Sequence, residues 1–353
     1  MSVHVITAQE VMARYDGFDA VLDARSEGEY ADDHLPGAHN WPSLNNEERI
    51  RVGTLYKQVS PFEAQKIGAA LVAQNISRHI LSHVLDKPKN WQPLVYCWRG
   101  GKRSNSLALI LGQIGFKVHL IEGGYKAFRS AVVTDTPRQV ERLHFRVLCG
   151  PTGSGKTRLL QALADQGAQV LDLEALASHR SSVLGAIPGQ PQPTQKAFET
   201  TLWQTLRRLQ PDRPVYVEAE SKKVGNVTIP DSLIEAMRSS PCVRLDLSLP
   251  HRVQLLLEDY DYFVKDPAFF CDRLDKLIDL KGRALIEEWK SRVHAGQTAA
   301  VVGELLEKHY DPGYETSTAR NFKHYAQAPA LKLDGPDHQA MAQAATALLT
   351  TSG

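Results

Sequence analysis

Cys97 ends a short apolar run and begins a loop rich in glycine and positive charge. The loop reads CWRGGKRS over residues 97–104. Backbone N–H groups in such a loop, the start of the following helix and nearby cations all stabilise a thiolate. Most cysteines are buried and inert, but the glycines and three adjacent cations here indicate a reactive thiol. We predict that Cys97 and Arg103 are catalytic. The other loop residues assigned to this site are Arg99, Gly100, Gly101, Lys102 and Ser104.

A second reactive loop is predicted at residues 150–157. Its sequence, GPTGSGKT, matches the pattern G-x-x-x-x-G-K-[ST] completely. An apolar strand is expected before it and a helix after it, which is the context in which this pattern binds phosphate. The glycines let backbone N–H groups close around phosphate oxygens, Lys156 adds positive charge, and Thr157 could hold a metal ion. The predicted phosphate-binding residues are Gly150, Gly153, Gly155, Lys156 and Thr157.

Two carboxylates end a later apolar strand, expected at residues 214–221. Phosphate-loop proteins place at such a position the acid that orients Mg²⁺ or activates a hydroxyl group. Glu218 and Glu220, spaced two apart, are expected to point to the same side of the strand. We assign Glu218 as catalytic; a solvated pair at a strand end is the alternative. Mg²⁺ is compatible with this site, but no residue set is assigned as a metal centre.

Composition is that of a globular protein with room for two domains. The chain has 353 residues, 42% of them hydrophobic and 23% charged, with a net charge of +1. A balance so close to neutral excludes a protein that coats nucleic acid without specificity. The four cysteines form no C-x-x-C pair, so reduced thiols are expected rather than a zinc or disulfide framework. With no signal-peptide pattern at residues 1–7 and no membrane-spanning run, we expect a cytoplasmic protein.

Strands and helices alternate through the first predicted domain, residues 1–137. Strands are expected at 19–25, 93–96 and 118–121, and helices at 63–74 and 106–111. This alternation predicts a parallel sheet, with the cysteine loop at the carboxyl end of a strand.

The second predicted domain, residues 138–353, begins with a short connecting segment at 138–142. Strands are expected at 143–149, 169–174, 214–221 and 242–249, with a helix at 157–163 and mainly helices after residue 249. Cations scattered over such helices are usually solvated, but a basic face could hold an RNA strand. The candidate RNA-binding residues are Arg207, Arg208, Lys222 and Lys223.

The first domain resembles the rhodanese family over residues 10–137. The resemblance rests on LDAR at 22–25, HLPGA at 34–38, the cysteine loop and EGG at 122–124. It implies that Cys97 carries sulfur or selenium as a persulfide or selenopersulfide, and we interpret Asp23 and Arg25 as an ion pair that holds the fold. One departure is the spacing C-x-x-G-x-x-R-S, one residue longer than is common in small rhodaneses. Cysteine phosphatases share that spacing, and the longer loop could accommodate a phosphate-bearing donor or selenium.

The whole chain resembles the tRNA 2-selenouridine synthases. A rhodanese domain precedes a phosphate-loop domain, and further matching stretches are AIPGQP at 186–191, EAES at 218–221 with Gly225, and HYDPGY at 309–314. The expected fold is therefore α/β: a rhodanese-like parallel sheet with flanking helices, then a P-loop NTPase-like α/β domain with a helical C-terminal part.

The family resemblance also implies a reaction. The substrate would be a tRNA with 2-thiouridine at the wobble position. Its sulfur would be alkylated with geranyl diphosphate held at the 150–157 loop. The sequence of this loop also resembles that of tRNA dimethylallyltransferases. Selenium derived from selenophosphate would then replace the S-geranyl group by way of Cys97. A selenophosphate-producing enzyme is a candidate partner and no membrane is involved. The oligomeric state stays open, with a monomer favoured over an oligomer.

Other readings of the same motifs stay open. One is an ATP- or GTP-dependent tRNA sulfurtransferase that activates a carbonyl oxygen and inserts sulfur from Cys97. Another is a cysteine phosphatase fused to a nucleotide-binding switch, although Tyr96 stands where phosphatases usually have histidine. A noncatalytic tRNA-binding scaffold is disfavoured because both reactive loops are intact.

Overall fold

The computed structural model describes residues 3–180, 182 and 185–350. By its internal contacts the chain forms two compact units: Met1–Thr136 with Thr194–Gln204, and Pro137–Pro193 with Thr205–Gly353. The ends of the two predicted domains, residues 1–2 and 351–353, lie outside the described residues, as do the first two residues of the N-terminal segment searched for a signal peptide. None of the described helices combines the length and apolar character needed to span a bilayer.

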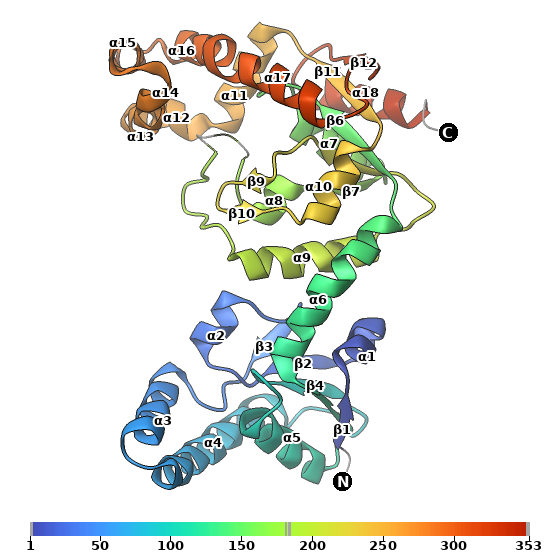
Figure 1. Cartoon of the computed structure of the whole chain (residues 1–353), viewed down its shortest axis with the longest axis vertical. Helices are drawn as coiled ribbons and strands as arrows, with labels where there is room; N and C mark the ends of the chain where they lie inside the picture. The colour runs from blue at the N-terminus through green and yellow to red at the C-terminus, as the bar shows by residue number, and fades with distance from the viewer. Residues whose placement is uncertain (1–2, 181, 183–184, 351–353) are drawn as a thin grey trace. The chain divides into compact units, whose positions relative to one another are not determined.

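The first unit is built on a parallel sheet with the strand order β1-β5-β4-β2-β3 (Figure 1). Its strands are β1 (Val3–Ile6), β2 (Ala20–Asp23), β3 (Ala38–Asn40), β4 (Pro93–Tyr96) and β5 (Val118–Ile121). Its helices are α1 (Ala8–Ala13), the 3-10 turn η1 (Tyr15–Gly17), α2 (Glu27–Asp32), α3 (Asn46–Gln58), α4 (Pro61–His83), α5 (Lys102–Ile114) and the first part of α6 (Gly124–Glu141). All residues of β4 and β5 are buried, as the continuous apolar character of parallel strands requires.

Local sequence explains where these helices begin. Ser60 caps α4 by accepting from the Phe62 N–H, and Pro61 occupies the first turn, where its missing N–H costs no hydrogen bond. The helix is longer than the predicted 63–74, and Ala64, Gly68 and Ile76 lie on its buried face. Two apolar clusters contain residues of this sheet; one is centred on Leu22, Val95 and Leu107, and the other includes Trp203 from α9.

The second unit has its own parallel sheet, in the order β12-β11-β6-β8-β7. Its strands are β6 (Phe145–Cys149), β7 (Gln169–Leu171), β8 (Val215–Glu218), β11 (Cys242–Asp246) and β12 (Ala330–Lys332), and a separate hairpin joins β9 (Lys223–Val224) and β10 (Val227–Thr228). Its helices up to residue 259 are α7 (Lys156–Asp165), α8 (Leu173–Ala177), the end of α9 (Gln195–Arg208), α10 (Asp231–Arg238) and α11 (Leu249–Asp259).

A helical part, coloured orange to red in Figure 1, follows β11. After α11 it comprises α12 (Asp261–Lys265), α13 (Pro267–Leu274), η2 (Asp275–Leu277), α14 (Ile278–Lys281), α15 (Arg283–His294), α16 (Thr298–Leu305), the π-helical turn η3 (Leu306–Tyr310) and α17 (Asp311–Asn321). A cluster of buried residues that includes Phe270, Trp289 and Leu305 forms its core. The last helix, α18 (His338–Thr350), packs on α7 beside the sheet. The α/β fold class is confirmed: two parallel sheets, with a helical part between β11 and β12 of the second.

The structure corrects three local predictions. Residues 138–142 are not a separate connecting segment, because α6 continues through Pro137 to Glu141. The proline removes one helical hydrogen bond, that to the Val133 carbonyl, and the neighbouring Thr136 hydroxyl donates to the Val132 carbonyl at 2.8 Å. The strand predicted at 169–174 stops at Leu171, because the Asp172 carboxylate accepts from the Ala175 N–H and caps α8. Glu220 does not share a strand with Glu218, which ends β8.

Candidate functional site

Cys97 lies at the carboxyl end of β4, where the chain turns into α5. Its Sγ accepts hydrogen bonds from the Gly101 N–H at 3.2 Å and from the Ser104 hydroxyl at 3.0 Å. Both donors favour negative charge on sulfur, and the first turn of α5 begins directly after Gly101. The thiol is 3% exposed. The predicted loop residues Gly101 and Ser104 therefore do converge on the sulfur, while Arg99 and Lys102 are exposed.

Gly124 explains why the EGG stretch accompanies the cysteine loop. Its φ is +58°, and a Cβ built on it would lie 2.3 Å from the Cys97 carbonyl oxygen and 2.6 Å from the Gly100 nitrogen. This close approach lets the next residues, Tyr125 and Lys126, donate backbone N–H bonds to the carbonyls of Cys97 and Trp98 at 2.8 and 3.1 Å. The first residues of α6 thus hold the cysteine loop in place through these two backbone hydrogen bonds.

Arg103, predicted to be catalytic, is paired with a residue that the sequence analysis did not single out. Its guanidinium donates to both carboxylate oxygens of Glu29, at 2.6 and 3.3 Å. Burial raises the pKa of Glu29, but the hydrogen bond and charge of Arg103, together with the Ser26 N–H and Arg49, leave that pKa below its usual value. The structure gives Arg103 no contact with Cys97 among the described hydrogen bonds, so its role there stays a prediction.

Asp23, Arg25 and Tyr96 form a buried polar group under the cysteine loop. Arg25 is 1% exposed and Asp23 fully buried, with 2.6 Å between the guanidinium and the carboxylate. The Tyr96 hydroxyl donates to the same carboxylate at 2.7 Å and accepts from the Leu35 N–H. The Arg25 guanidinium also lies over the Tyr125 ring and donates to the Asp33 carbonyl. These contacts fit the interpretation of Asp23 and Arg25 as an ion pair that holds the fold.

Residues 150–157 of the second unit form the predicted loop between β6 and α7. Gly153 and Gly155 have φ of +75° and +85°, and Gly155 is the residue before α7, which begins at Lys156. A Cβ at Gly150 would lie 2.3 Å from the Ser154 hydroxyl oxygen and 2.9 Å from its Cβ, so a larger residue there would displace Ser154. The Lys156 ammonium donates a hydrogen bond to the Gly150 carbonyl at the other end of the loop, at 2.7 Å. All five predicted phosphate-binding residues belong to one loop, and Gly153, Gly155, Lys156 and Thr157 line a cleft of about 650 Å³.

Two long-range contacts support this loop. Arg252 of α11, which is 6% exposed, donates to the Thr152 carbonyl at 2.7 and 3.0 Å and pairs with Asp311. The Gly150 N–H donates to the Tyr314 hydroxyl oxygen at 2.5 Å, and the Lys156 ammonium lies 5.7 Å from the centre of the Tyr314 ring. Burial is the main reason that the pKa of Tyr314 is raised. Asp311 and Tyr314 both belong to the HYDPGY stretch, which was the only sequence signal for them.

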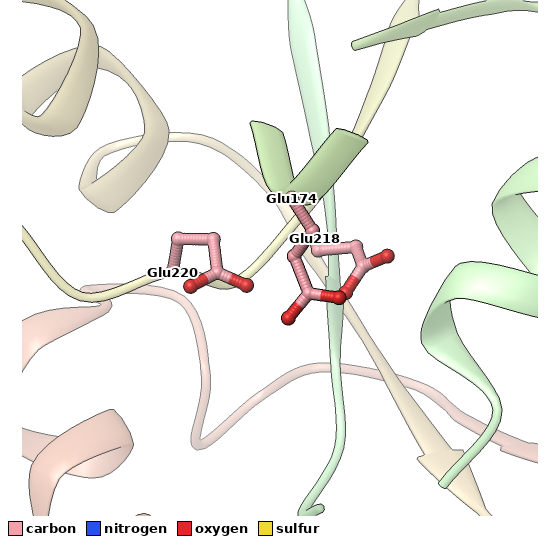
Figure 2. A group of neighbouring side chains, drawn as sticks. All are labelled: Glu174, Glu218 and Glu220. Atoms are coloured by element: carbon pink, nitrogen blue, oxygen red, sulfur yellow. The ribbon is translucent and has the colours of Figure 1, made fainter. Parts of the chain in front are cut away.

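Three carboxylates meet beside the phosphate loop. Since β6 and β8 are neighbours, the end of β8 at Glu218 lies next to the start of the loop. Glu174 of α8, Glu218 and Glu220 each place a carboxylate oxygen within 4.8 Å of the other two. Figure 2 shows these three side chains. Glu218 is 2% exposed, and its Oε1 finds no hydrogen-bond donor among the described residues. Burial first, and then the charge of Glu174, raise the pKa of Glu218 well above its usual value.

The four candidate RNA-binding cations come from two separate segments of the second unit. Arg207 and Arg208 end α9, whereas Lys222 and Lys223 lie at the β9 hairpin. Lys222 is paired with Asp231 at 2.6 Å, and Arg208 and Lys223 are exposed. Their role stays a prediction.

The two loops lie in regions that match known family models. Residues 7–131 match the rhodanese-like domain, and residues 143–276 match the tRNA 2-selenouridine synthase AAA domain. The chain is 40% identical over 244 residues to the tRNA 2-selenouridine synthase of Nitrosomonas europaea, covering 68% of this chain and 63% of that protein. It is 39% identical to the corresponding protein of Nitrosomonas eutropha over 72% of this chain and 66% of that protein.

A third relative aligns over more of its length. The tRNA 2-selenouridine synthase of a Sulfurovum species is 32% identical over 330 residues, covering 85% of this chain and 89% of that protein. The fold and the two family models define a protein that joins a rhodanese-like unit to an AAA-type α/β unit. The chain belongs to the tRNA 2-selenouridine synthase family. The alignments with the two Nitrosomonas proteins span less than two thirds of those proteins.

Proposed function

We propose that the chain converts 2-thiouridine at the wobble position of a tRNA into 2-selenouridine in two steps. The sulfur is first geranylated with geranyl diphosphate and is then replaced by selenium from selenophosphate. The observation that carries the proposal is that a member of this family holds both a hydrogen-bonded thiol at Cys97 and a phosphate loop lining a large cleft. The names of the relatives support tRNA as the substrate class.

The alkylation step uses the phosphate loop. The thiocarbonyl sulfur attacks C1 of geranyl diphosphate, the C1–O bond breaks, and its electron pair leaves with the diphosphate. The uridine N3 proton is lost to a base. N–H groups of residues 150–157 and the start of α7 stabilise the charge that develops on the leaving group. Lys156 contributes once its ammonium turns from the Gly150 carbonyl, 2.7 Å away, to the diphosphate.

The carboxylate group beside the loop fits a magnesium ion. Hard cations prefer carboxylate oxygens, and three carboxylates converge here around the buried Oε1 of Glu218. Glu174, Glu218 and Glu220, with the Thr157 hydroxyl, would hold the ion. Bound there, it would supply positive charge to the diphosphate. In its absence Glu218 retains its proton more readily than an exposed carboxyl group.

Selenium delivery uses the cysteine loop. A thiocarbonyl sulfur is a poor leaving group, whereas an S-geranyl group leaves as a neutral thiol. The net reaction of S-geranyl uridine, selenophosphate and water gives selenouridine, geranyl thiol and phosphate, so selenium needs no external oxidant or reductant overall. Cys97 attacks the phosphorus of selenophosphate, and the P–Se bond breaks with its electron pair on selenium. The selenide then displaces the S-geranyl group at C2, and water releases phosphate from the Cys97 sulfur, whose anion is stabilised by its two hydrogen-bond donors.

One observation favours a second candidate. A buried acid at the end of the strand next to a phosphate loop is also the arrangement by which nucleotide-hydrolysing proteins position Mg²⁺. An ATP- or GTP-dependent tRNA sulfurtransferase would therefore use the same residues. The two candidates differ in whether turnover consumes nucleotide.

A reconstituted reaction separates them. The full chain is incubated with an RNA stem-loop containing 2-thiouridine and with geranyl diphosphate, in buffer free of nucleotide, and nucleosides are identified by mass spectrometry. We expect S-geranyl-2-thiouridine, and 2-selenouridine after selenophosphate is added. A strict requirement for ATP or GTP would overturn the geranyl proposal. Hydrolysis of an aryl phosphate at Cys97 without any change in the RNA would instead support a phosphatase.

A further inference from the structure

A small apolar cavity adjoins the phosphate cleft inside the helical part of the second unit. Thr152, Leu256, Tyr260 and Tyr310 line both the cleft and the cavity. The cavity offers about 40 Å³ to the centres of water-sized atoms, compared with about 650 Å³ for the cleft. Its inner lining consists of Leu257, Phe263, Phe270, Val302, Leu305 and Leu306.

This lining belongs to the core of the helical part. Phe270 and Leu306 are each 1% exposed, and Phe263, Val302 and Leu305 are also buried. Cores pack tightly, and an unfilled cavity lowers stability in proportion to its volume. An apolar space of this kind favours hydrocarbon over water. Its position beside Thr152 of the phosphate loop therefore suits a ligand that carries phosphate at one end and hydrocarbon at the other.

We propose that this cavity binds the hydrocarbon end of an isoprenoid diphosphate whose diphosphate lies on residues 150–157. The inference rests on the prenyl transfer proposed above and adds the part of the chain that recognises the prenyl group. Leu256, Tyr260 and Tyr310, which line both spaces, cover the middle of the isoprenoid. C1 stays in the open cleft, where a sulfur nucleophile can reach it.

The cavity is small enough to select for chain length. About 40 Å³ is room for about three water-sized groups, so it takes the last few carbons of a ten-carbon chain. Each methylene moved from water into an apolar site strengthens binding about fourfold, so three of them contribute on the order of 50-fold. Phe270, Val302 and Leu305 are among the six residues that line the cavity and not the cleft, and all three are buried. These three side chains are therefore the specificity-determining residues.

The test measures the binding of geranyl diphosphate and of inorganic pyrophosphate to the full chain by calorimetry. We expect the wild-type chain to bind geranyl diphosphate more tightly than pyrophosphate. Val302→Phe, which fills the cavity, should weaken geranyl diphosphate binding by roughly tenfold or more and leave pyrophosphate binding unchanged. The matched control is Val264→Phe on α12, where the side chain is 49% exposed and does not line the cavity. It should change neither affinity.

A second variant keeps the test decisive if Val302→Phe fails to fold, which loss of pyrophosphate binding would reveal. Leu305→Ala enlarges the cavity and should shift preference from geranyl toward farnesyl diphosphate. Equal wild-type affinities for geranyl diphosphate and pyrophosphate, or no shift in chain-length preference in Leu305→Ala, would overturn the inference. Transfer of the geranyl group to RNA is scored separately. Tight geranyl diphosphate binding without transfer would refute the proposed reaction while leaving the cavity assignment intact.

Discussion

Replacing Gly124 by alanine should damage the cysteine loop while sparing the second unit. The new Cβ would lie 2.3 Å from the Cys97 carbonyl oxygen and 2.6 Å from the Gly100 nitrogen, distances that real Cβ atoms do not show. A non-glycine residue at a left-handed φ costs roughly 1–2 kcal/mol. Forcing α6 away from the loop also breaks the N–H bonds from Tyr125 and Lys126, at about 1 kcal/mol each. The expected loss is about 3–4 kcal/mol of the first unit's stability.

Gly37 provides the matched control. Its φ is +68°, close to the +58° of Gly124, but a Cβ there would meet nothing within 4 Å. Gly37→Ala should therefore lower the free energy of unfolding only by the roughly 1–2 kcal/mol that a left-handed φ costs an alanine. Both variants lie in the same unit, so the difference between them isolates the contact with the cysteine loop.

Urea unfolding followed by tryptophan fluorescence measures this difference. Trp41, Trp91, Trp98 and Trp203 lie in the first unit and only Trp289 lies in the second, so the signal reports mainly on the first. With a urea dependence of about 1–3 kcal/mol/M, Gly124→Ala should unfold at about 1 M less urea than Gly37→Ala. Pyrophosphate binding at the second unit should be unchanged. Equal midpoints for the two variants, with normal selenium transfer in Gly124→Ala, would refute this account of the EGG stretch.

Three further predictions concern single side chains. Ser104→Ala removes the hydroxyl 3.0 Å from Cys97 Sγ and should slow alkylation of Cys97 by iodoacetamide at neutral pH about tenfold; an unchanged rate would contradict the assigned hydrogen bond. Glu218→Gln should lower geranyl transfer about 100-fold or more at saturating Mg²⁺ while leaving selenium transfer to RNA that already carries S-geranyl-2-thiouridine intact. Geranyl transfer at the wild-type rate would show that Glu218 takes no part in this step. Burial first, then the charge of Arg14, lower the pKa of His119 to about 4. The folded state therefore binds this proton less tightly than the unfolded state, and stability present above pH 6.5 should be lost as pH falls toward 4, by about 1–2 kcal/mol after solvent screening. His119→Gln should flatten that part of the pH profile of urea unfolding, and a profile as steep as that of the wild type would exclude His119 as its source.

Sequence was sufficient where the pattern is local. Strand β4 and the cysteine loop follow each other directly in the sequence, as do β6, the phosphate loop and α7. The spacing of apolar residues and the positions of the glycines therefore locate Cys97 and Lys156 before the fold is known. The sequence predicted the ends of helices and strands less well, because capping side chains decide where a helix begins. Asp172 turns the end of a predicted strand into α8 and so moves Glu174 onto a helix beside Glu218.

Contacts between distant residues could not be read from the sequence. Arg252 reaches the Thr152 carbonyl and Asp311, and Glu29 holds Arg103, over separations of 59 residues or more. Nothing in the local composition of either partner specifies the other. The same is true of the segment Thr194–Gln204, which comes after the phosphate loop in the sequence yet belongs to the first unit. There Thr200 donates to the buried Asp33 carboxylate and Trp203 packs against Tyr15 and Phe128.

The central claim is that two loops perform two separable steps on one uridine. The most direct test is mass spectrometry of the nucleosides formed by the full chain and two variants from 2-thiouridine RNA, geranyl diphosphate and selenophosphate. Cys97→Ala should accumulate S-geranyl-2-thiouridine without selenouridine, and Lys156→Ala should leave 2-thiouridine unchanged. If Cys97→Ala stopped geranylation as completely as selenium incorporation, the division of labour between the loops would be wrong.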